Sequence, residues 1–417
     1  MSTPDPRRER RDRLAVLWTS FAGFSAMFAV WMMFGVLGLP IRDELGLSDV
    51  QFGWLVAVAI LNGAIWRLLF GLLADRYGGR KVFIANLIAA AVPAFLVARA
   101  ASYEELLVYA FLVGLAGNSF AVGSAWNAAW FPPAQQGLAM GLFGAGNVGA
   151  SLTKFIGPAL IAAVPATGLL GGLIPGGWRF VPFLYGGLLL AMALATWALT
   201  PRVDRRPAAG RTLAQMLTPL REVRVWRFSL YYVVVFGAYV ALASWLPKYY
   251  VDVYGLPLAA AALLTTPFIL ASSLLRPFGG WLADRYGPRR VTYWVFGATI
   301  AATAALLLPV GVNAFTALVL AVGVAQGIGK ASTIKYVPEY YPKDVGVVVG
   351  LVGTLGALGG FFMPPLFAYL TELSGRPQAV FAVILAVTAV SLTWLHAVVV
   401  GLRRTARRAA LEASRAR

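Results

Sequence analysis

Five cations interrupt the apolar segments of this 417-residue sequence. They are Arg67, Lys154, Arg276, Lys330 and Lys335. All 17 Asp and Glu residues fall in tails, in loops or at the ends of the apolar segments. Because an ionisable side chain in hydrocarbon is costly, it is kept only where it faces a partner or a water-filled path. Since no carboxylate lies among these cations, their predicted partner is a bound anion.

An internal repeat places two of the cations at equivalent positions. Residues 67–82 match residues 276–291 at a shift of 209, with ten identical residues among sixteen. Arg67 and Arg276 begin the two copies, and each precedes the Asp of a DRYG motif by eight residues, or about 12 Å of helix. This distance exceeds the reach of a snorkelling side chain, so both are predicted near the membrane midplane. A guanidinium there can bind a small planar oxyanion through two parallel hydrogen bonds.

The three lysines have different expected roles. Lys330 lies deep in its apolar segment and is a candidate for a charge in the binding pocket or for a proton carrier. Lys335 is the second candidate for these roles, although its place at the inner end of the segment favours snorkelling to the surface. Lys154 lies past the middle of its segment, where we expect a gate or snorkelling to the outer headgroups rather than contact with a substrate.

The elements that must position these residues are membrane-spanning helices. The chain is 59% hydrophobic and 12% charged, about half the charge of a soluble protein. Twelve apolar runs have roughly the 20 residues that cross a hydrocarbon core. They lie near 15–39, 52–74, 82–99, 105–131, 136–164, 179–200, 227–247, 258–283, 291–310, 314–337, 345–370 and 378–402. The expected fold class is an all-α membrane protein with twelve transmembrane helices.

The charges predict how these helices are oriented. Of the 35 Lys and Arg, 25 lie in the two tails, in segments 75–81, 202–227 and 285–290, and at Lys343, all on one side of a twelve-span topology. Only five lie on the other side, and the positive-inside rule therefore predicts that both termini are cytoplasmic. The net charge of +18 then indicates topology and contact with anionic lipid, and not nucleic acid. The first run is expected to be a span and not a cleaved signal peptide.

The repeat also predicts the domain organisation. Its shift of 209 persists beyond the first match, since Gly114 falls on Gly323. We expect an N-terminal six-helix bundle at 1–200, a cytoplasmic linker at 201–227 and a pseudo-symmetric C-terminal six-helix bundle at 228–417. Parallel repeats of this kind are typical of transporters whose site lies between the halves and opens alternately to each side of the membrane.

Two of the expected helices, at equivalent positions of the repeat, are rich in glycine. Small residues spaced three or four apart let helices approach closely, and their density here predicts surfaces that slide or bend during a transport cycle. The expected gating glycines are Gly144, Gly146, Gly149, Gly353, Gly356 and Gly359. Asn147 lies among the first three, where its amide can orient a substrate oxygen.

The two DRYG motifs lie at cytoplasmic turns of this topology. Their carboxylates and neighbouring arginines can cap helix ends and form ion pairs between the halves that break when the inside opens. The residues of this expected cytoplasmic gate are Asp75, Arg76, Arg80, Asp284, Arg285 and Arg289.

Other classes of function lack their necessary residues. The sequence has no Cys and a single His, His396, which argues against a metal site. It has no GxxxxGK[ST] motif, so the energy for transport must come from gradients of ions or substrates. An intramembrane enzyme would need carboxylate pairs, His clusters or a Ser/His arrangement. We therefore expect no enzyme, no cofactor and no metal. An anion channel is conceivable, but the repeat and the glycine-rich helices favour alternating access.

Over essentially the whole chain, the twelve spans, the six-plus-six repeat and the DRYG motifs resemble the major facilitator superfamily. Within it, GNSFAVG at 117–123, the segment 130–151 and the glycines of the eleventh helix resemble the nitrate/nitrite porter family. The resemblance implies that Arg67 and Arg276 bind substrate. It also implies pocket roles for Phe120, Asn147, Tyr232 and Phe236.

The resemblance also bears on coupling. Two features resemble the branch of proton-linked nitrate importers more than the nitrate/nitrite exchangers. They are the short connection between the fourth and fifth helices and the segment GAGNVGAS. Lys330 departs from the family pattern, which has a small or amide residue there. We expect secondary active transport of nitrate, and of nitrite as a second substrate, by nitrate/proton symport. The alternatives are electroneutral nitrate/nitrite antiport and exchange of organic anions or phosphate.

The expected partners are small inorganic anions, protons and membrane lipid. The protein is expected to be a monomeric, multi-pass protein of the cytoplasmic membrane of a prokaryote.

Overall fold

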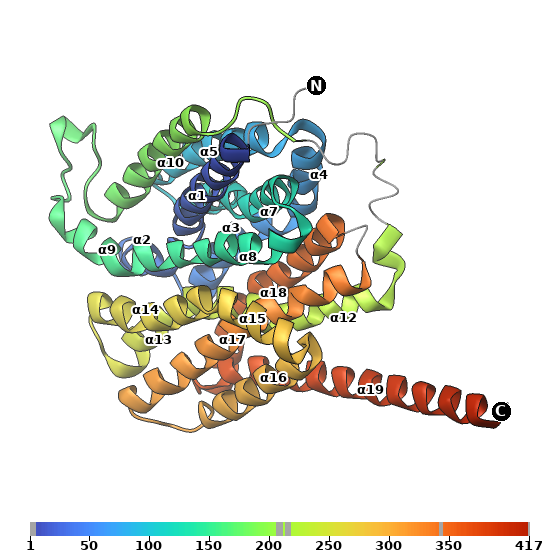
Figure 1. Ribbon diagram of the computed structural model, residues 1–417. Helices are drawn as coiled ribbons and strands as arrows, with labels where there is room; N and C mark the ends of the chain where they lie inside the picture. The colour runs from blue at the N-terminus through green and yellow to red at the C-terminus, as the bar shows by residue number, and fades with distance from the viewer. Residues whose placement is uncertain (1–5, 206–211, 213–217, 342–344, 416–417) are drawn as a thin grey trace.

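The structure is a computed structural model that describes residues 6–205, 212, 218–341 and 345–415. In these residues the chain is almost entirely helical, and the one β-type contact is an isolated bridge between Leu169 and Ile174. Figure 1 shows the helices of the first half of the chain above those of the second half.

The first half contains ten α-helices and two 3₁₀ segments that position the site. They are α1 (Pro6–Trp31), α2 (Phe34–Leu45), α3 (Asp49–Ile65), α4 (Arg67–Tyr77), α5 (Gly79–Val97), α6 (Tyr103–Val113), η1 (Gly114–Asn118), α7 (Ser119–Trp130), α8 (Pro133–Gly144), η2 (Ala145–Val148), α9 (Gly149–Ala163) and α10 (Phe180–Leu199).

The second half follows the same plan with fewer interruptions. Its elements are α12 (Val223–Tyr232), the π-helix η6 (Val233–Gly237), α13 (Ala238–Tyr254), α14 (Leu258–Leu274), α15 (Arg276–Tyr286), α16 (Pro288–Ala305), α17 (Val312–Tyr340), α18 (Val345–Ser374) and α19 (Ala379–Arg415). The exact bundle boundaries remain a prediction.

These elements form the twelve predicted spans. In the described part of the chain, nine helical runs are long and apolar enough to cross a membrane, and the bent pair α14 and α15 makes a tenth. The run α8–η2–α9 and the helix α16 supply the other two spans. The predicted fold class, an all-α membrane protein, is therefore confirmed.

Several predicted spans are broken near their middle, which the apolar runs alone did not indicate. The second and eighth spans break at Trp66 and Leu275, which are equivalent in the repeat and have nearly the same backbone angles, φ −88° and −82°. The seventh span contains the π-helix η6, and the fifth contains the 3₁₀ segment η2. Irregular backbone is tolerated at membrane depth only where protein buries it or where it lines a cavity. Two of the breaks directly precede Arg67 and Arg276.

The glycine-rich helices lie at the interface between the halves. α18 packs against α3 and α4 of the first half, and α9 and α8 pack against α14 and α15 of the second half. The two contacts are related by the internal repeat. Small residues allow this close packing because they bring backbones together.

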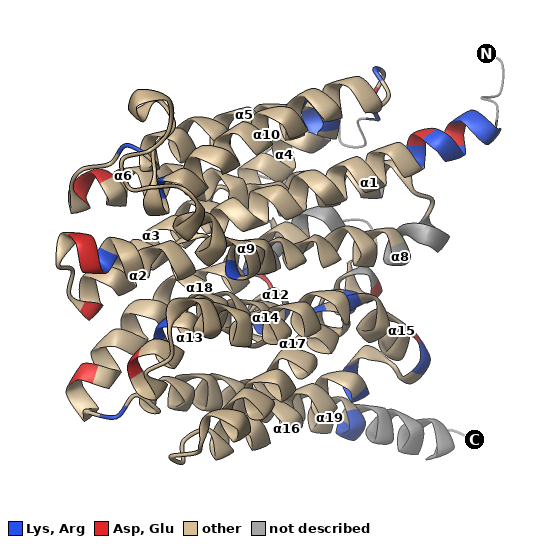
Figure 2. Ribbon diagram, turned by 90° about the vertical axis from the view of Figure 1, so that its left-hand side faces the viewer, with Lys and Arg blue, Asp and Glu red and all other residues tan. Residues whose placement is uncertain are grey.

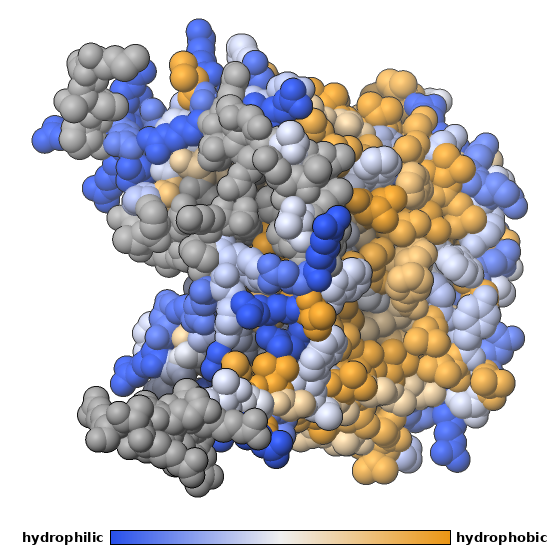
Figure 3. All heavy atoms as spheres, turned by 90° about the vertical axis from the view of Figure 1, so that its right-hand side faces the viewer, coloured by the Kyte–Doolittle hydropathy of each residue, from blue (hydrophilic) through white to orange (hydrophobic). Residues whose placement is uncertain are grey.

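The charges gather at the two ends of the helices. Figure 2 shows most of the blue Lys and Arg residues at the end that carries both chain termini, which we call the terminal face. We call the other end the opposite face. Figure 3 shows an apolar band between hydrophilic side chains at the two ends, and a hollow between the halves on the terminal face. This distribution fits a protein that spans a membrane.

Candidate anion-binding site

Arg67 and Arg276 are buried at the interface between the halves. They are the first residues of α4 and α15, and only 0% and 5% of their surfaces are exposed. Neither side chain snorkels to a surface, as the sequence predicted. The helix breaks place them at midspan and turn them toward the opposite half.

Each arginine donates a hydrogen bond to a backbone carbonyl of the other half. Arg67 Nη1 lies 3.1 Å from the oxygen of Gly353 in α18, and Arg276 Nη1 lies 3.1 Å from the oxygen of Gly144 in α8. Gly144 and Gly353 are equivalent in the repeat. The two bonds are therefore a pseudo-symmetric pair that joins the halves through the residues predicted to bind substrate.

The guanidinium groups retain capacity for a ligand. Arg67 Nη2 donates to the oxygen of Gly117 in η1, at 3.1 Å, while Arg67 Nε has no hydrogen-bond partner among the described residues. A carbonyl is a neutral acceptor, and a guanidinium bonds an anion more strongly. An oxyanion at this position would accept a hydrogen bond from Arg67 Nε and would be a stronger acceptor than the carbonyls for the other guanidinium donors.

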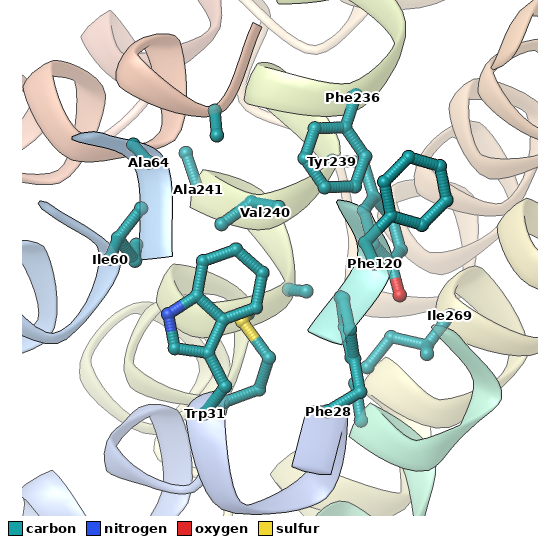
Figure 4. Close-up of a cluster of buried hydrophobic side chains, with 14 of the residues drawn as sticks. Phe28, Trp31, Ile60, Ala64, Phe120, Phe236, Tyr239, Val240, Ala241 and Ile269 are labelled. Carbon is teal, nitrogen blue, oxygen red and sulfur yellow. The ribbon is translucent and has the colours of Figure 1, made fainter. Parts of the chain in front are cut away.

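Aromatic rings surround both guanidinium groups. The Phe120 ring centroid lies 5.6 Å from Arg67 Cζ and 5.5 Å from Arg276 Cζ, so one ring contacts both arginines. Phe236 and Trp31 lie 5.4 and 5.7 Å from Arg67 Cζ. These distances are within the range of cation–π attraction. Figure 4 shows Trp31, Phe120 and Phe236 in one buried cluster.

Tyr232 and Asn147 contribute polar groups that lack partners. Tyr232 stacks on Phe236 at 5.1 Å between centroids, and its buried hydroxyl has no partner among the described residues. The side chain of Asn147 in η2 is fully buried, and neither its nitrogen nor its oxygen has a described partner. A buried polar group without a hydrogen bond is destabilising. Its persistence here favours a role in binding.

Lys330 lies close to this cluster, and Lys335 lies apart from it. Lys330 in α17 is fully buried and donates to the Ser272 oxygen at 3.1 Å and to Ser272 Oγ at 2.8 Å. Lys335 forms an ion pair with Asp284 in its own half, near the terminal face. The geometry thus places Lys330, and not Lys335, beside the aromatic rings of the arginine cluster.

Tyr239 is a residue of the cluster that the sequence analysis missed. Its ring centroid lies 3.1 Å from Lys330 Nζ, and its hydroxyl bonds to the Asn147 carbonyl at 3.3 Å, across the interface. It also lies 3.4 Å from Ser273 Oγ. The signal was available, because Tyr239 follows Tyr232 and Phe236 at a spacing of seven and three residues, which places all three on one helix face.

The six predicted gating glycines lie where another part of the protein comes close. Added Cβ atoms would lie 2.8 Å from Arg276 Cζ at Gly144, 2.6 Å from Phe24 at Gly146, 1.8 Å from the Ser25 oxygen at Gly149, 3.4 Å from Arg67 Cδ at Gly353, 2.4 Å from Tyr232 at Gly356 and 2.7 Å from Val233 at Gly359. Real Cβ atoms essentially never approach closer than 3.0 Å. Five of the six glycines are therefore needed for close packing, whereas the contact at Gly353 is an ordinary one. Motion at these positions stays a prediction.

The predicted cytoplasmic gate has its described contacts within each half. Arg80 donates to Thr200 Oγ1 at 3.0 Å, and Arg289 donates to the Tyr340 hydroxyl. The cations of Arg76 and Arg285 lie over aromatic rings of neighbouring residues. The Asp75 side chain lies outside the described residues. Ion pairs between the halves at this face remain a prediction for a state in which the hollow is closed.

Ion pairs between the halves occur instead at the opposite face. Lys248 Nζ in α13 lies 3.1 Å from Asp49 in α3, and Arg42 in α2 lies 3.6 Å from Asp252 in α13. These pairs could not be predicted from the sequence, because the residues are distant along the chain and carry no motif. They hold the halves together on this face, whereas the terminal face is hollowed between them (Figure 3).

The fold and the site together define a transporter, and not an enzyme. The comparisons with known proteins define the family. Residues 19–320 and 258–416 match the model of the Major Facilitator Superfamily. The chain is 62% identical to the "Probable nitrate/nitrite antiporter NarK1" of Thermus thermophilus over 95% of this chain and 94% of that protein.

A more distant relative supports the same family, and a solved structure supports the fold. The chain is 31% identical to the "Nitrite extrusion protein" of Bacillus subtilis, over 84% of this chain and 86% of that protein. It has a fold similar to the crystal structure of a bacterial homolog to the human lysosomal transporter Spinster, with a TM-score of 0.68, 18% identity and 95% of each chain covered. The chain therefore belongs to the major facilitator superfamily and, within it, to the nitrate/nitrite porter family.

Proposed function

We propose that this protein transports nitrate and nitrite by alternating access, and that one anion binds at a time between Arg67 and Arg276. The observation that carries the proposal is the pair of buried guanidinium groups, one from each half, around the shared ring of Phe120. A site that both halves contribute to can be exposed by turns to the two sides of the membrane. The names of the relatives supply the identity of the anion.

The shape of the site favours a planar anion. Two guanidinium forks and the Asn147 amide offer donors, and the rings of Phe120 and Phe236 lie over the guanidinium groups, where a flat anion can stack beside them. A planar anion of three or four atoms can be held there, whereas a tetrahedral anion is larger and, as a dianion, more costly to desolvate.

Substitution of the arginines by lysine tests the assignment. Lysine keeps the charge but cannot form the bidentate contact. R67K and R276K should each nearly abolish nitrate counterflow in proteoliposomes while the elution volume and thermal stability stay normal. R99K changes an exposed arginine and serves as the matched control. Near-normal counterflow in both buried variants would refute the site.

We propose the orientation from the positive-inside rule. The terminal face, with both chain ends, is then cytoplasmic, and the opposite face is the outer one (Figure 2). The hollow on the terminal face then opens inward. Residence in the cytoplasmic membrane of a prokaryote, contact with anionic lipid and a monomeric state belong to the same proposal.

We propose proton symport as the coupling mode, with Lys330 as the proton carrier. Importing a lone anion against an inside-negative potential costs about 2.3 kcal/mol per 100 mV, so concentrative uptake needs more than one proton per nitrate to gain from the voltage. Among the described residues, no Asp, Glu or His contacts the arginine cluster. Lys330 lies against Tyr239 and is the titratable amine nearest to the cluster.

Exchange of nitrate for nitrite is the second candidate, which the name of the Thermus thermophilus relative favours. Exchange is electroneutral and needs no proton carrier. K330M separates the two modes, because under symport it should remove the dependence of uptake on a pH gradient and spare nitrate/nitrite counterflow. Wild-type uptake that ignores the pH gradient and requires internal nitrite would refute symport and leave Lys330 as a fixed charge.

A further inference from the structure

Lys154 is a buried cation that the central site does not use. It lies in α9 with 1% of its surface exposed, so it does not snorkel to a surface. Its Nζ donates to the Met32 oxygen at 3.2 Å, at the break between α1 and α2. No carboxylate pairs with it among the described residues. A buried charge that a single neutral carbonyl compensates is costly, so its presence calls for a further partner.

A polar stripe connects Lys154 with the central site. Asn147, Ser151 and Lys154 follow one another at four and three residues, which places them on one face of the helical run. Ser151 is 6% exposed, and its Oγ has no partner among the residues described. The stripe covers about 10 Å of helix. It leads from the arginine cluster toward the opposite face, because η2 and α9 run in that direction (Figure 2).

Residues of the second half of the chain lie beside the polar stripe. A Cβ added to Gly35 in α2 would lie 3.2 Å from Lys154 Nζ and 2.8 Å from the Cα of Ser244 in α13. Lys154 is therefore at the contact between the halves. Ser244 lies along α13 between Tyr239 of the central cluster and Lys248 of the ion pairs on the opposite face. Lys154 thus lies between the central site and the ion pairs on the opposite face.

We propose that Lys154 and Ser151 form a second anion subsite, which holds a small monovalent oxyanion between the arginines and the opposite face. This inference rests on the proposed function. Opening of the opposite face must separate Gly35 from Ser244, and that separation exposes Lys154 Nζ to the entering anion. The lysine offers three rotatable donors and a compact charge, and Ser151 Oγ adds a hydrogen bond. The Asn147 amide then receives the anion next to the arginines.

The test compares transport from the two faces with nitrate as the probe. In proteoliposomes of known protein orientation, K154M should raise the KM for nitrate that enters from the opposite face by about tenfold, the effect of losing one charge-assisted hydrogen bond. The KM from the terminal face should stay within about twofold. S151A should raise the same KM by a smaller factor. K154R should restore most of the loss, and K81M, which removes an exposed charge, is the matched control.

Equal KM values for K154M and the wild type from the opposite face would overturn the subsite. So would a fall in maximal rate from both faces with unchanged KM, which indicates a structural role. S151A keeps the test valid if K154M fails to fold. Absence of nitrate counterflow in the wild type would overturn the proposed function and the subsite together, whereas normal wild-type counterflow with an unaffected K154M would overturn the subsite alone.

Discussion

The alanine substitutions G144A and G353A should have unequal effects, although the two glycines are equivalent in the repeat. A Cβ at Gly144 would lie 2.8 Å from Arg276 Cζ, whereas a Cβ at Gly353 would lie 3.4 Å from Arg67 Cδ, which is an ordinary contact. In G144A the guanidinium must move by about 0.6 Å to reach the same separation. This shift would lengthen its 3.1 Å bond to the Gly144 oxygen beyond hydrogen-bond range.

Loss of that bond removes the hydrogen bond that holds the Arg276 guanidinium group in position. A charge-assisted hydrogen bond contributes about 1.5–3 kcal/mol, so we expect the KM of nitrate counterflow to rise by about tenfold or more in G144A. In G353A it should change by less than about threefold. The assay is counterflow in proteoliposomes, with thermal stability measured on both variants.

The two variants control each other, because both replace glycine by alanine in a helix that packs against the other half. Alanine favours a helix over glycine by about 1 kcal/mol, and this gain is common to both. An unchanged KM in G144A, or an equal loss in G353A, would show that the positions of the arginines do not depend on these carbonyls.

Three further predictions concern the opposite face, the cluster and selectivity. K248M removes an ion pair between the halves, so a cysteine placed at Ser244, in a chain that has no other cysteine, should react faster with a thiol reagent added from that face; an unchanged rate would argue against a closing role for the pair. Y239F should raise the nitrate KM by a few-fold at most, and Y239L by more, because only leucine removes the ring beside Lys330; equal effects would assign the role to the hydroxyl. Sulfate and phosphate should compete with nitrate far less than nitrite does in binding assays, and equal competition would refute the planar site.

Much of the fold could be predicted from the sequence because its signals are local or repeated. Apolar runs locate spans wherever lipid is the solvent, and a repeat of 209 residues implies two similar bundles. The arginines were identifiable for the same reason, since a charge inside an apolar run is rare.

The remaining features depend on packing between distant segments. The carbonyls of Gly144 and Gly353 carry no side-chain signal, so their bonds to the arginines could not be read from the sequence. The break at Trp66 has no Pro beside it, whereas Pro277 follows the break at Leu275, so a proline signal marks only one of the two equivalent positions. Burial of Lys154 was missed because its partner is a backbone oxygen exposed by a break in another helix.

The bonds from the arginines to glycine carbonyls also make substrate concentration a conformational effector. Each bond joins the two halves and uses a donor that an anion can use. Binding of the anion and contact between the halves therefore use the same guanidinium donors. An anion that replaces a neutral carbonyl shifts the equilibrium between closed and open forms by mass action. A carboxylate in place of either carbonyl would compete permanently with the substrate, and in the described part of the chain the arginines donate to backbone carbonyls instead.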